Sequence, residues 1–250
     1  MANATFNAGI DYFGLESASS NALKVKSSAE NRSKQSTSGA NTAGDAVVVD
    51  SWGETAAPSA EYDVVAALDE STFPELGSVT TITGIGPVVF GSLTISTQTG
   101  SAPTVSASGQ MVQTGATQLR EYPLPDMSLT PRHRAQDFLG FASIKKGNAA
   151  ADPDADYGLS SVSATFPIVI TTAMPKGDLK TYDLHGEMAT CNYTMQWYSA
   201  TAPTIELTAA ATTLGATMSE PVAKSDPEGG YTQYTWTVAL PMVGSEHSTP

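Results

Sequence analysis

The densest group of possible metal ligands lies in one short acidic turn. Asp152, Asp154 and Asp156 place a carboxylate at every second position of this turn. Carboxylates at this spacing suit calcium, which takes roughly six to eight oxygen ligands in proteins. An EF-hand loop would also need Gly at its sixth position and Glu at its twelfth, where this sequence has Tyr157 and Ser163. We therefore expect an acidic turn without a metal, and keep a calcium site as the weaker alternative.

The residues that could act as nucleophiles or general bases are scattered along the sequence. His133, His185 and His247 are not at metal-ligand spacing from one another or from the single cysteine, Cys191. Cys191 and His185 could form a nucleophile and a base, but no third residue is placed to orient that pair. The sequence has no nucleophile elbow, no P-loop and no glycine-rich dinucleotide motif. We predict no catalytic residue, no cofactor and no enzymatic activity.

The composition excludes several classes of protein. Asp and Glu number 25 and Lys and Arg 12 among 250 residues, which gives a formal net charge of −13. A protein that grips nucleic acid needs a basic surface, so this charge argues against that class. A single cysteine cannot form an intrachain disulfide, which excludes a disulfide-stapled scaffold. Because the sequence shows neither a run of roughly 18–20 apolar residues nor a signal segment, we expect a soluble protein from a reducing compartment, with no membrane partner.

The charged residues are unevenly distributed. Basic residues fall mainly into two clusters, which are Lys24, Lys26, Arg32 and Lys34, and then Arg120, Arg132, Arg134, Lys145 and Lys146. The stretch 35–119 contains many acidic residues but no Lys or Arg. Solvated surfaces that keep the protein in solution are the simpler interpretation. The alternative is that acidic and basic surfaces of neighbouring copies meet and guide self-assembly.

Most of the chain has the residue pattern of β-strands. Two segments alternate strongly, and their predicted core faces are Cys191, Tyr193, Met195 and Trp197 in one and Tyr234, Trp236, Val238 and Leu240 in the other. Alternation of such residues with Thr and Gln is typical of strands with one buried face. Segment 28–45 is rich in Ser, Asn, Thr and Gly, and offers little apolar area to offset the entropy of ordering it. We predict that it is a long, mobile loop at the tip of a hairpin.

One segment breaks the strand pattern. Thr130 is a candidate N-cap and Pro131 suits the first helical position, so the sequence predicts an α-helix over 131–143. Arg132 and Arg134 lie at the end of this helix where the macrodipole disfavours positive charge. We therefore expect these arginines to pair with acidic groups, for example those of a neighbouring copy.

The predicted organisation is a single β-rich domain between two flexible ends. The domain covers 15–240, with a flexible N-terminal arm over 1–14 and a C-terminal tail over 241–250. Neither end has the apolar residues to fold alone. Segments of this kind become ordered when they contact a neighbouring subunit.

Five short segments of the sequence belong together, namely Leu23–Glu30, Asp50–Glu54, Pro58–Tyr62, Gln118–Pro123 and Thr130–Phe138. With the predicted strands, helix and long hairpin loop, they resemble the tail tube proteins of long-tailed, siphovirus-like bacteriophages. The resemblance lies in architecture and in these segments, and spans roughly 20–240. It implies a β-sandwich or half-open barrel with one flanking α-helix and a long hairpin loop that reaches the adjacent ring.

The same resemblance implies a structural role in the virion. Hexameric rings would stack into a hollow tail tube, assembled in the host cytoplasm, with other phage tail proteins as partners. DNA would pass through this tube without specific binding, because a negative lumen offers its phosphates no ion pairs. The candidate lumen-facing residues are Asp45, Asp50, Glu54, Glu61 and Asp63. Subunit contacts would come from the hairpin tip at 28–45 and from the helix. The candidate subunit-interface residues are Lys24, Lys26, Arg32, Lys34, Arg132 and Arg134.

Two other classes of protein stay open. The first is another virion component, such as a head decoration, neck or baseplate protein. The second is a secreted β-sandwich that binds carbohydrate or protein, with calcium held by Asp152, Asp154 and Asp156. An enzyme ranks third, because no residue constellation argues for catalysis.

Overall fold

The computed structural model describes 9–112, 120–133, 138, 142–146, 149–150, 159–173, 180–197, 204–226 and 231–244. Within these residues the chain is mainly β, as predicted. The strands are β1 (Leu23–Ala40), β2 (Ala46–Val64), β3 (Leu68–Asp69), β4 (Val79–Ile82), β5 (Gly86–Gln98), β6 (Thr104–Met111), β7 (Ser128–Leu129), β8 (Ala142–Lys146), β9 (Ala149–Ala150), β10 (Leu159–Ala173), β11 (Lys180–Gly186), β12 (Met188–Trp197), β13 (Thr204–Leu207), β14 (Thr217–Met218), β15 (Val222–Asp226) and β16 (Tyr231–Pro241). The helices are α1 (Leu15–Ala18), α2 (Ala209–Thr213) and the 3₁₀ turn η1 (Glu70–Thr72).

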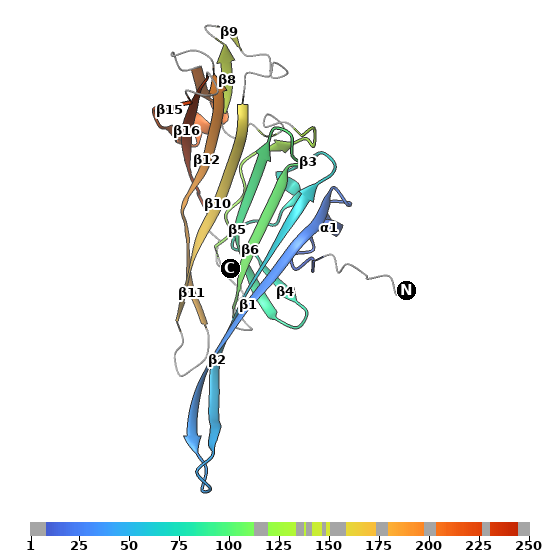
Figure 1. Cartoon of the computed structure of the whole chain (residues 1–250), viewed down its shortest axis with the longest axis vertical. Helices are drawn as coiled ribbons and strands as arrows, with labels where there is room; N and C mark the ends of the chain where they lie inside the picture. Colours follow the sequence, from blue (N-terminus) through green and yellow to red (C-terminus); the bar gives the residue numbers. More distant parts are fainter. Residues whose placement is uncertain are drawn as a thin grey trace, which may run out of the picture.

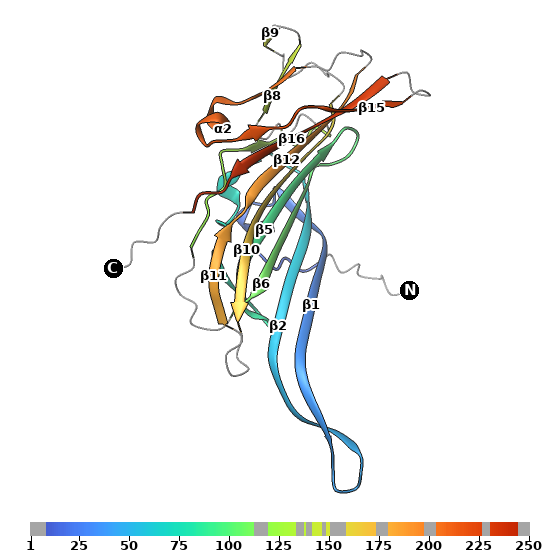
Figure 2. The ribbon, with the colours of Figure 1, turned by 90° about the vertical axis from the view of Figure 1, so that its left-hand side faces the viewer.

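One large antiparallel sheet organises the molecule. It has 11 strands, with the order β1-β2-β6-β5-β10-β12-β16-β14, while β4 pairs with β5, β11 with β10 and β15 with β16. Figures 1 and 2 show this sheet as a long twisted layer, from which the β1–β2 hairpin projects past the other strands. Strand β1 is therefore an edge strand of the sheet.

One face of this sheet forms the core. Cys191, Tyr193 and Met195 of β12 are fully buried, and Trp236 and Val238 of β16 lie beside them. This confirms the core faces predicted from the alternating pattern, apart from Trp197, whose side chain lies outside the described residues. Side chains on a strand point alternately to the two faces, so the Thr residues between these positions belong to the opposite face.

Short elements cover the core from the other side. They include the three-stranded sheet β13-β8-β9, the pair β3-β7 and helices α1 and α2, which contribute Leu15, Leu129, Ala142, Ile205 and Ala211 to the core. The backbone N–H of Ala142 also donates to the hydroxyl oxygen of Tyr193, at 3.0 Å. The arrangement is consistent with the predicted β-sandwich or half-open barrel.

The predicted hairpin is present, but its irregular part is shorter than expected. Strand β1 continues to Ala40 and β2 resumes at Ala46, and the two pair from Ser28↔Ala60 to Ala40↔Ala46, with register shifts between Ser33 and Gln35 and between Thr37 and Ser38. In the turn between the strands, the side chain of Asn41 accepts from the N–H groups of Ala43 and Asp45. Antiparallel pairing satisfies the backbone groups on the facing edges of the two strands without a core. A composition poor in apolar residues therefore did not prevent strand formation.

The helix predicted over 131–143 is wrong at the places where the structure describes this segment. His133 has a φ of 59°, the left-handed region, which cannot continue an α-helix. At the other end, Ala142 and Ser143 belong to β8. Residues 134–137 and 139–141 of this segment, including Arg134, lie outside the described residues. The described α-helices stand elsewhere, as α1 and α2.

The structure describes residues 9–14 of the predicted N-terminal arm and 241–244 of the predicted C-terminal tail. Residues 9–14, predicted as part of the flexible arm, pack on the sheet, and Phe13 contacts Phe90 edge to face with ring centroids 5.4 Å apart. In the C-terminal tail, Pro241 still belongs to β16 and Met242 is half-buried against the core. Residues 1–8 and 245–250 lie outside the described residues. No described helix has the length and apolar character needed to span a membrane.

Candidate assembly surfaces

The face of the main sheet that points away from the core is lined with hydroxyl groups. Strands β5, β6, β10, β12 and β16 contribute most of this hydroxyl face, and β2 adds its margin. Its members include Ser59, Ser92, Thr94, Ser96, Ser106, Ser108, Ser163, Thr165, Thr190, Asn192 and Thr237. Hydroxyl pairs bridge neighbouring strands, with Ser92–Ser108 at 2.7 Å, Thr94–Thr165 at 3.2 Å and Ser96–Ser163 at 3.1 Å. Such cross-strand pairs stabilise a sheet from its exposed side.

The hydroxyl face has no formal charge over its central strands. Strands β5, β6, β10, β12 and β16 contain no Asp, Glu, Lys or Arg at all. Charged side chains return only toward the β1–β2 edge and on the short strands β11 and β15. This charge-free surface was missed from the sequence. The signal that could have found it is the alternation of Ser or Thr with apolar residues in several strands.

The predicted basic and acidic surfaces meet within one chain. The Nζ atom of Lys26 lies 2.8 Å from an oxygen of Glu61 and 3.9 Å from one of Asp63, and Lys24 lies 2.7 Å from Glu16. The hydrogen bond to Glu61 raises the pKa of Lys26, and the hydrogen bond from Lys24 lowers the pKa of Glu16. Glu61 and Asp63, two of the candidate lumen residues, are therefore both partners of Lys26, a candidate interface residue on the neighbouring strand.

A second group of charges lies further along the hairpin. Arg32 pairs with Glu30, its Nη1 atom lies 3.5 Å from Glu54, and its Nη2 atom donates to the carbonyl of Gly84 at 2.6 Å. The hydrogen bond with Glu30 is the main cause that raises the pKa of Arg32. Lys34 is exposed and forms no ion pair with any described residue. Arg32 thus connects the hairpin to the β4–β5 turn.

Asp45, Asp50 and Arg132, which were also predicted as lumen or interface residues, lie in separate parts of the described structure. Asp45 accepts from the side-chain amide of Asn41 in the turn of the hairpin, at 3.0 Å. Asp50 lies in β2 opposite Thr37, and its side chain is outside the described set. Arg132 is exposed in the loop before His133. The predicted charged sets therefore divide among the hairpin turn, the hairpin base and a loop.

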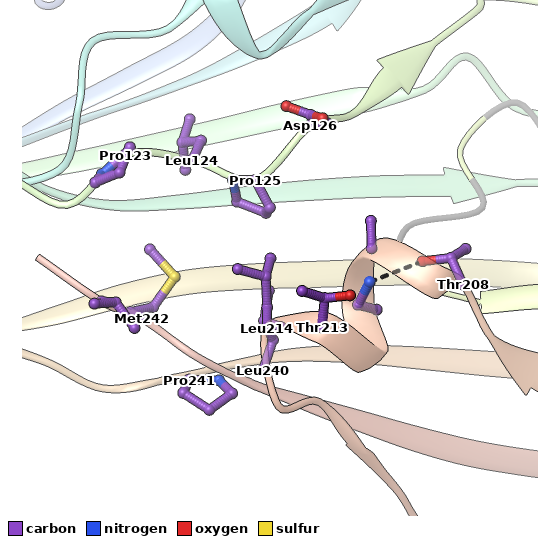
Figure 3. Close-up of a pocket in the computed structure, with 13 residues that line it drawn as sticks. Pro123, Leu124, Pro125, Asp126, Thr208, Thr213, Leu214, Leu240, Pro241 and Met242 are labelled. Atoms are coloured by element: carbon purple, nitrogen blue, oxygen red, sulfur yellow. Dashed lines mark hydrogen bonds between the residues drawn. The ribbon is translucent and has the colours of Figure 1, made fainter.

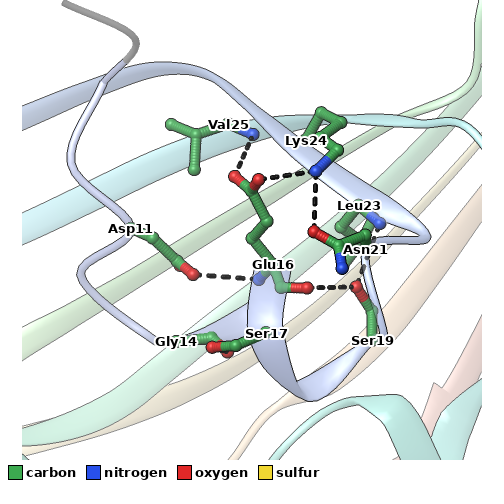
Figure 4. A network of polar contacts seen from close by, with 9 residues as sticks. All are labelled: Asp11, Gly14, Glu16, Ser17, Ser19, Asn21, Leu23, Lys24 and Val25. Atoms are coloured by element: carbon green, nitrogen blue, oxygen red, sulfur yellow. Dashed lines mark hydrogen bonds and ion pairs between the residues drawn. The ribbon is translucent and has the colours of Figure 1, made fainter.

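The first described residues form a strap, residues 9–22, along the base of β1 (Figure 4). The carboxylate of Asp11 accepts from the N–H groups of Leu15, at 3.0 Å, and Glu16, at 2.9 Å, and so holds the start of α1. The hydroxyl of Tyr62 donates to the same carboxylate at 2.7 Å. Burial, followed by this hydrogen bond, raises the pKa of Tyr62. The strap is therefore fixed to the sheet by its own polar network.

An apolar groove of about 460 Å³ lies between the loop 123–126, helix α2 and the end of β16. Figure 3 shows Leu124 and Pro125 of one loop facing Leu214, Leu240 and Met242. Among the described residues, Asp126 is the one ionisable side chain that lines it. No described residue of the groove pairs this carboxylate with a nucleophile or a second titratable group.

The predicted metal ligands and the predicted cysteine pair stand differently in the structure. Asp152, Asp154 and Asp156 lie outside the described residues, and among the described ones no cluster of His, Cys, Asp and Glu could hold a metal ion. Cys191 is buried on the core face of β12, whereas His185 is exposed on β11. A buried thiol of this kind behaves as a small apolar side chain.

Comparison with known proteins adds no relationship. No protein-family model matches the chain, and a search of curated protein sequences finds no match.

Proposed function

We propose that this protein is a non-enzymatic structural subunit that assembles with copies of itself into stacked rings, forming the hollow tail tube of a bacteriophage virion. The observation that carries the proposal is the hydroxyl face, a broad, half-exposed sheet surface without charge over β5, β6, β10, β12 and β16. Phosphate groups bind proteins chiefly through Lys and Arg. A wall of hydroxyl groups lets DNA pass without ion pairs that would retain it.

In this proposal the hydroxyl face lines the lumen of the tube. The five acidic residues named as lumen candidates from the sequence do not line it together. Glu61 and Asp63 lie at the margin of the hydroxyl face, where Lys26 partly neutralises them. Glu54 pairs with Arg32 instead, so it belongs to the hairpin rather than to the lumen. The net charge of −13 still prevents DNA from binding to the subunit as a whole.

The β1–β2 hairpin supports self-assembly. Figures 1 and 2 show its outer part beyond the rest of the sheet, with no core beneath it. An isolated two-stranded hairpin is at best marginally stable in water. A second copy would supply the packing that this hairpin lacks, as the resemblance to tail tube proteins implies for an adjacent ring.

Negative-stain microscopy of the purified chain across concentration and salt tests this proposal. Tubes of stacked rings are expected. A closed ring or trimer without stacking would instead favour a head decoration, neck or baseplate protein. A strictly monomeric particle at high concentration would overturn self-assembly altogether.

A shortened hairpin tests the role of the projecting part. Ser36–Ser51 is replaced by Asn-Gly, which joins Gln35 to Trp52, a pair already in register. We expect a folded chain that no longer forms tubes. Ala43→Ser, a change in the turn that preserves hairpin length, is the matched control and should assemble normally. Tubes from the shortened variant would exclude the hairpin as an assembly element.

A further inference from the structure

The strap closes the free edge of β1 over its first residues. Strand β2 occupies one side of β1, so the N–H groups on the other side have no strand partner. There, the N–H of Leu23 donates to Oγ of Ser19 at 3.0 Å, and the N–H of Val25 donates to Oε2 of Glu16 at 3.4 Å. Leu23 and Val25 are two residues apart, so their N–H groups point to the same edge of the strand. Side chains of the strap thus replace the partner that a further strand would provide (Figure 4).

The start of the strap extends this cover to Ser28. The N–H of Ile10 donates to Oγ of Ser28 at 2.7 Å. Gly9 approaches the same residue so closely that an added Cβ would lie 2.8 Å from the backbone nitrogen of Ser28. A side chain at position 9 would therefore push the strap away from β1. The cover runs from Leu23 to Ser28, the part of β1 that lies over the core.

The cover ends where the projecting hairpin begins. From Ala29 to Ala40, none of the described residues outside the hairpin bonds to the backbone of β1. The strap itself is anchored, because Leu15 is buried, Phe13 packs on Phe90, and Asp11 binds Tyr62. Its contact with the edge at Val25, in contrast, depends on the half-buried carboxylate of Glu16, held by Lys24 at 2.7 Å.

We propose that the strap is an edge guard, which keeps the Leu23–Ser28 edge from pairing with a strand of another copy and leaves only the outer edge of β1, Ala29–Ala40, open to such pairing. An uncovered edge strand is a template for strand addition, and proteins commonly block such edges. Because a shift of one residue turns every side chain to the opposite face, blocking the inner edge also restricts the register in which two copies can meet. The biological use of an edge guard rests on the proposed self-assembly, whereas the experiment that tests the guard does not require it.

Opening the guard should increase uncontrolled association. In the double variant Glu16→Ala, Ser19→Ala, the N–H groups of Leu23 and Val25 lose their acceptors. We expect faster amide exchange at these two positions. We also expect the concentration for half-association in sedimentation velocity to fall by about tenfold, the effect of one or two added backbone hydrogen bonds. The measurement is made below the concentration at which tubes form.

Two single variants separate the guard from general charge effects. Glu61→Ala removes the comparable ion pair with Lys26 but leaves the edge covered, so its association should equal that of the wild type. Glu16→Gln loses the charge but keeps an oxygen that can accept from Val25, so it should remain guarded. Equal association of the double variant and Glu61→Ala, with the amides of Leu23 and Val25 freed, would overturn the proposal.

The test distinguishes a variant that fails to fold, a failure of the proposed tail tube function and a failure of the edge guard. If circular dichroism shows that the double variant does not fold, Glu16→Ala alone is measured with the same two outcomes. A wild-type chain that never forms tubes would refute the tail tube function. The difference in association between the guarded and unguarded variants would still decide whether the strap protects the edge.

Discussion

The central sheet and the projecting hairpin are built from the same kind of strand but held by different forces. In the central sheet, one face of each strand is buried, and β12 and β16 pack Tyr193 and Trp236 into the core. In the projecting hairpin, β1 and β2 are held by backbone pairing and by ion pairs such as Arg32–Glu54. Burial of apolar area contributes far more to stability than exposed ion pairs do. The central sheet therefore carries the fold, and the hairpin is free to change without loss of folding.

The largest effect is expected from the central sheet. Trp236→Ala removes a side chain that is 2% exposed, and leaves a cavity next to Tyr234 and Val238. Deletions of this kind cost about 3–5 kcal/mol. Urea unfolding should show this loss in the free energy of unfolding. A loss below about 1 kcal/mol, the value expected for an exposed pair, would remove the contrast between the two regions.

A smaller effect is expected where the main sheet meets its cover. Tyr193→Phe leaves the ring in place but removes the acceptor for the N–H of Ala142. An unsatisfied buried N–H costs about 1–3 kcal/mol. Thermal unfolding should show the decrease, and amide exchange at Ala142 should become faster. Tyr234→Phe on the neighbouring strand β16 serves as the comparison, because it also removes a hydroxyl from a buried tyrosine ring.

The hairpin base should tolerate loss of its ion pair. Glu61→Gln removes the partner that holds Lys26, at an exposed position. Exposed pairs contribute less than about 1 kcal/mol, and salt screens them. The free energy of unfolding should change by no more than this, and the difference from the wild type should shrink as salt is added. A larger loss that persists at high salt would mean that the hairpin base contributes to the core.

The smallest effect should appear as a pH dependence at the strap. The hydrogen bond from Lys24 lowers the pKa of Glu16 below its ordinary value of 4.5. A lowered folded-state pKa contributes stability that is present above the ordinary pKa and is lost as pH falls through the folded-state value. The wild type should therefore have a slightly higher melting temperature than Glu16→Gln at neutral pH, and this difference should vanish in acid. A difference that grows as the pH falls would show that another group is responsible.

Much of the fold follows from residue patterns that act over a few positions. The alternation in β12 and β16 predicted which residues are buried, because each strand turns every second side chain to the same face. The acidic balance and the single cysteine excluded a nucleic-acid-binding surface and a disulfide scaffold. The helix over 131–143 was wrong in its described parts. An N-cap candidate and a proline at the first helical position are weak signals against the left-handed backbone of His133 and the pairing of β8 with β13.

The candidate surfaces depended on contacts between residues that are distant in sequence. Lys26 and Glu61 were assigned to different surfaces of the molecule, but antiparallel pairing of β1 and β2 places them side by side. The hydroxyl face could have been suspected strand by strand, yet its continuity depends on the order of β6, β5, β10, β12 and β16. The strap over the β1 edge had no signal in the sequence, because Glu16 in α1 and Ser19 at its C-cap are ordinary residues for such positions.

The sequence by itself determined a mainly β chain with alternating core faces, a hairpin and an excess of negative charge, because strand alternation and net charge are properties of neighbouring residues. Only the tertiary structure decided which strands are adjacent, which charges neutralise one another and which edge is covered. Those features arise from pairing over long separations in the chain, as between Lys26 and Glu61 or between Tyr62 and Asp11. The order and register that create them are chosen by the packing of the whole sheet, which no local pattern specifies.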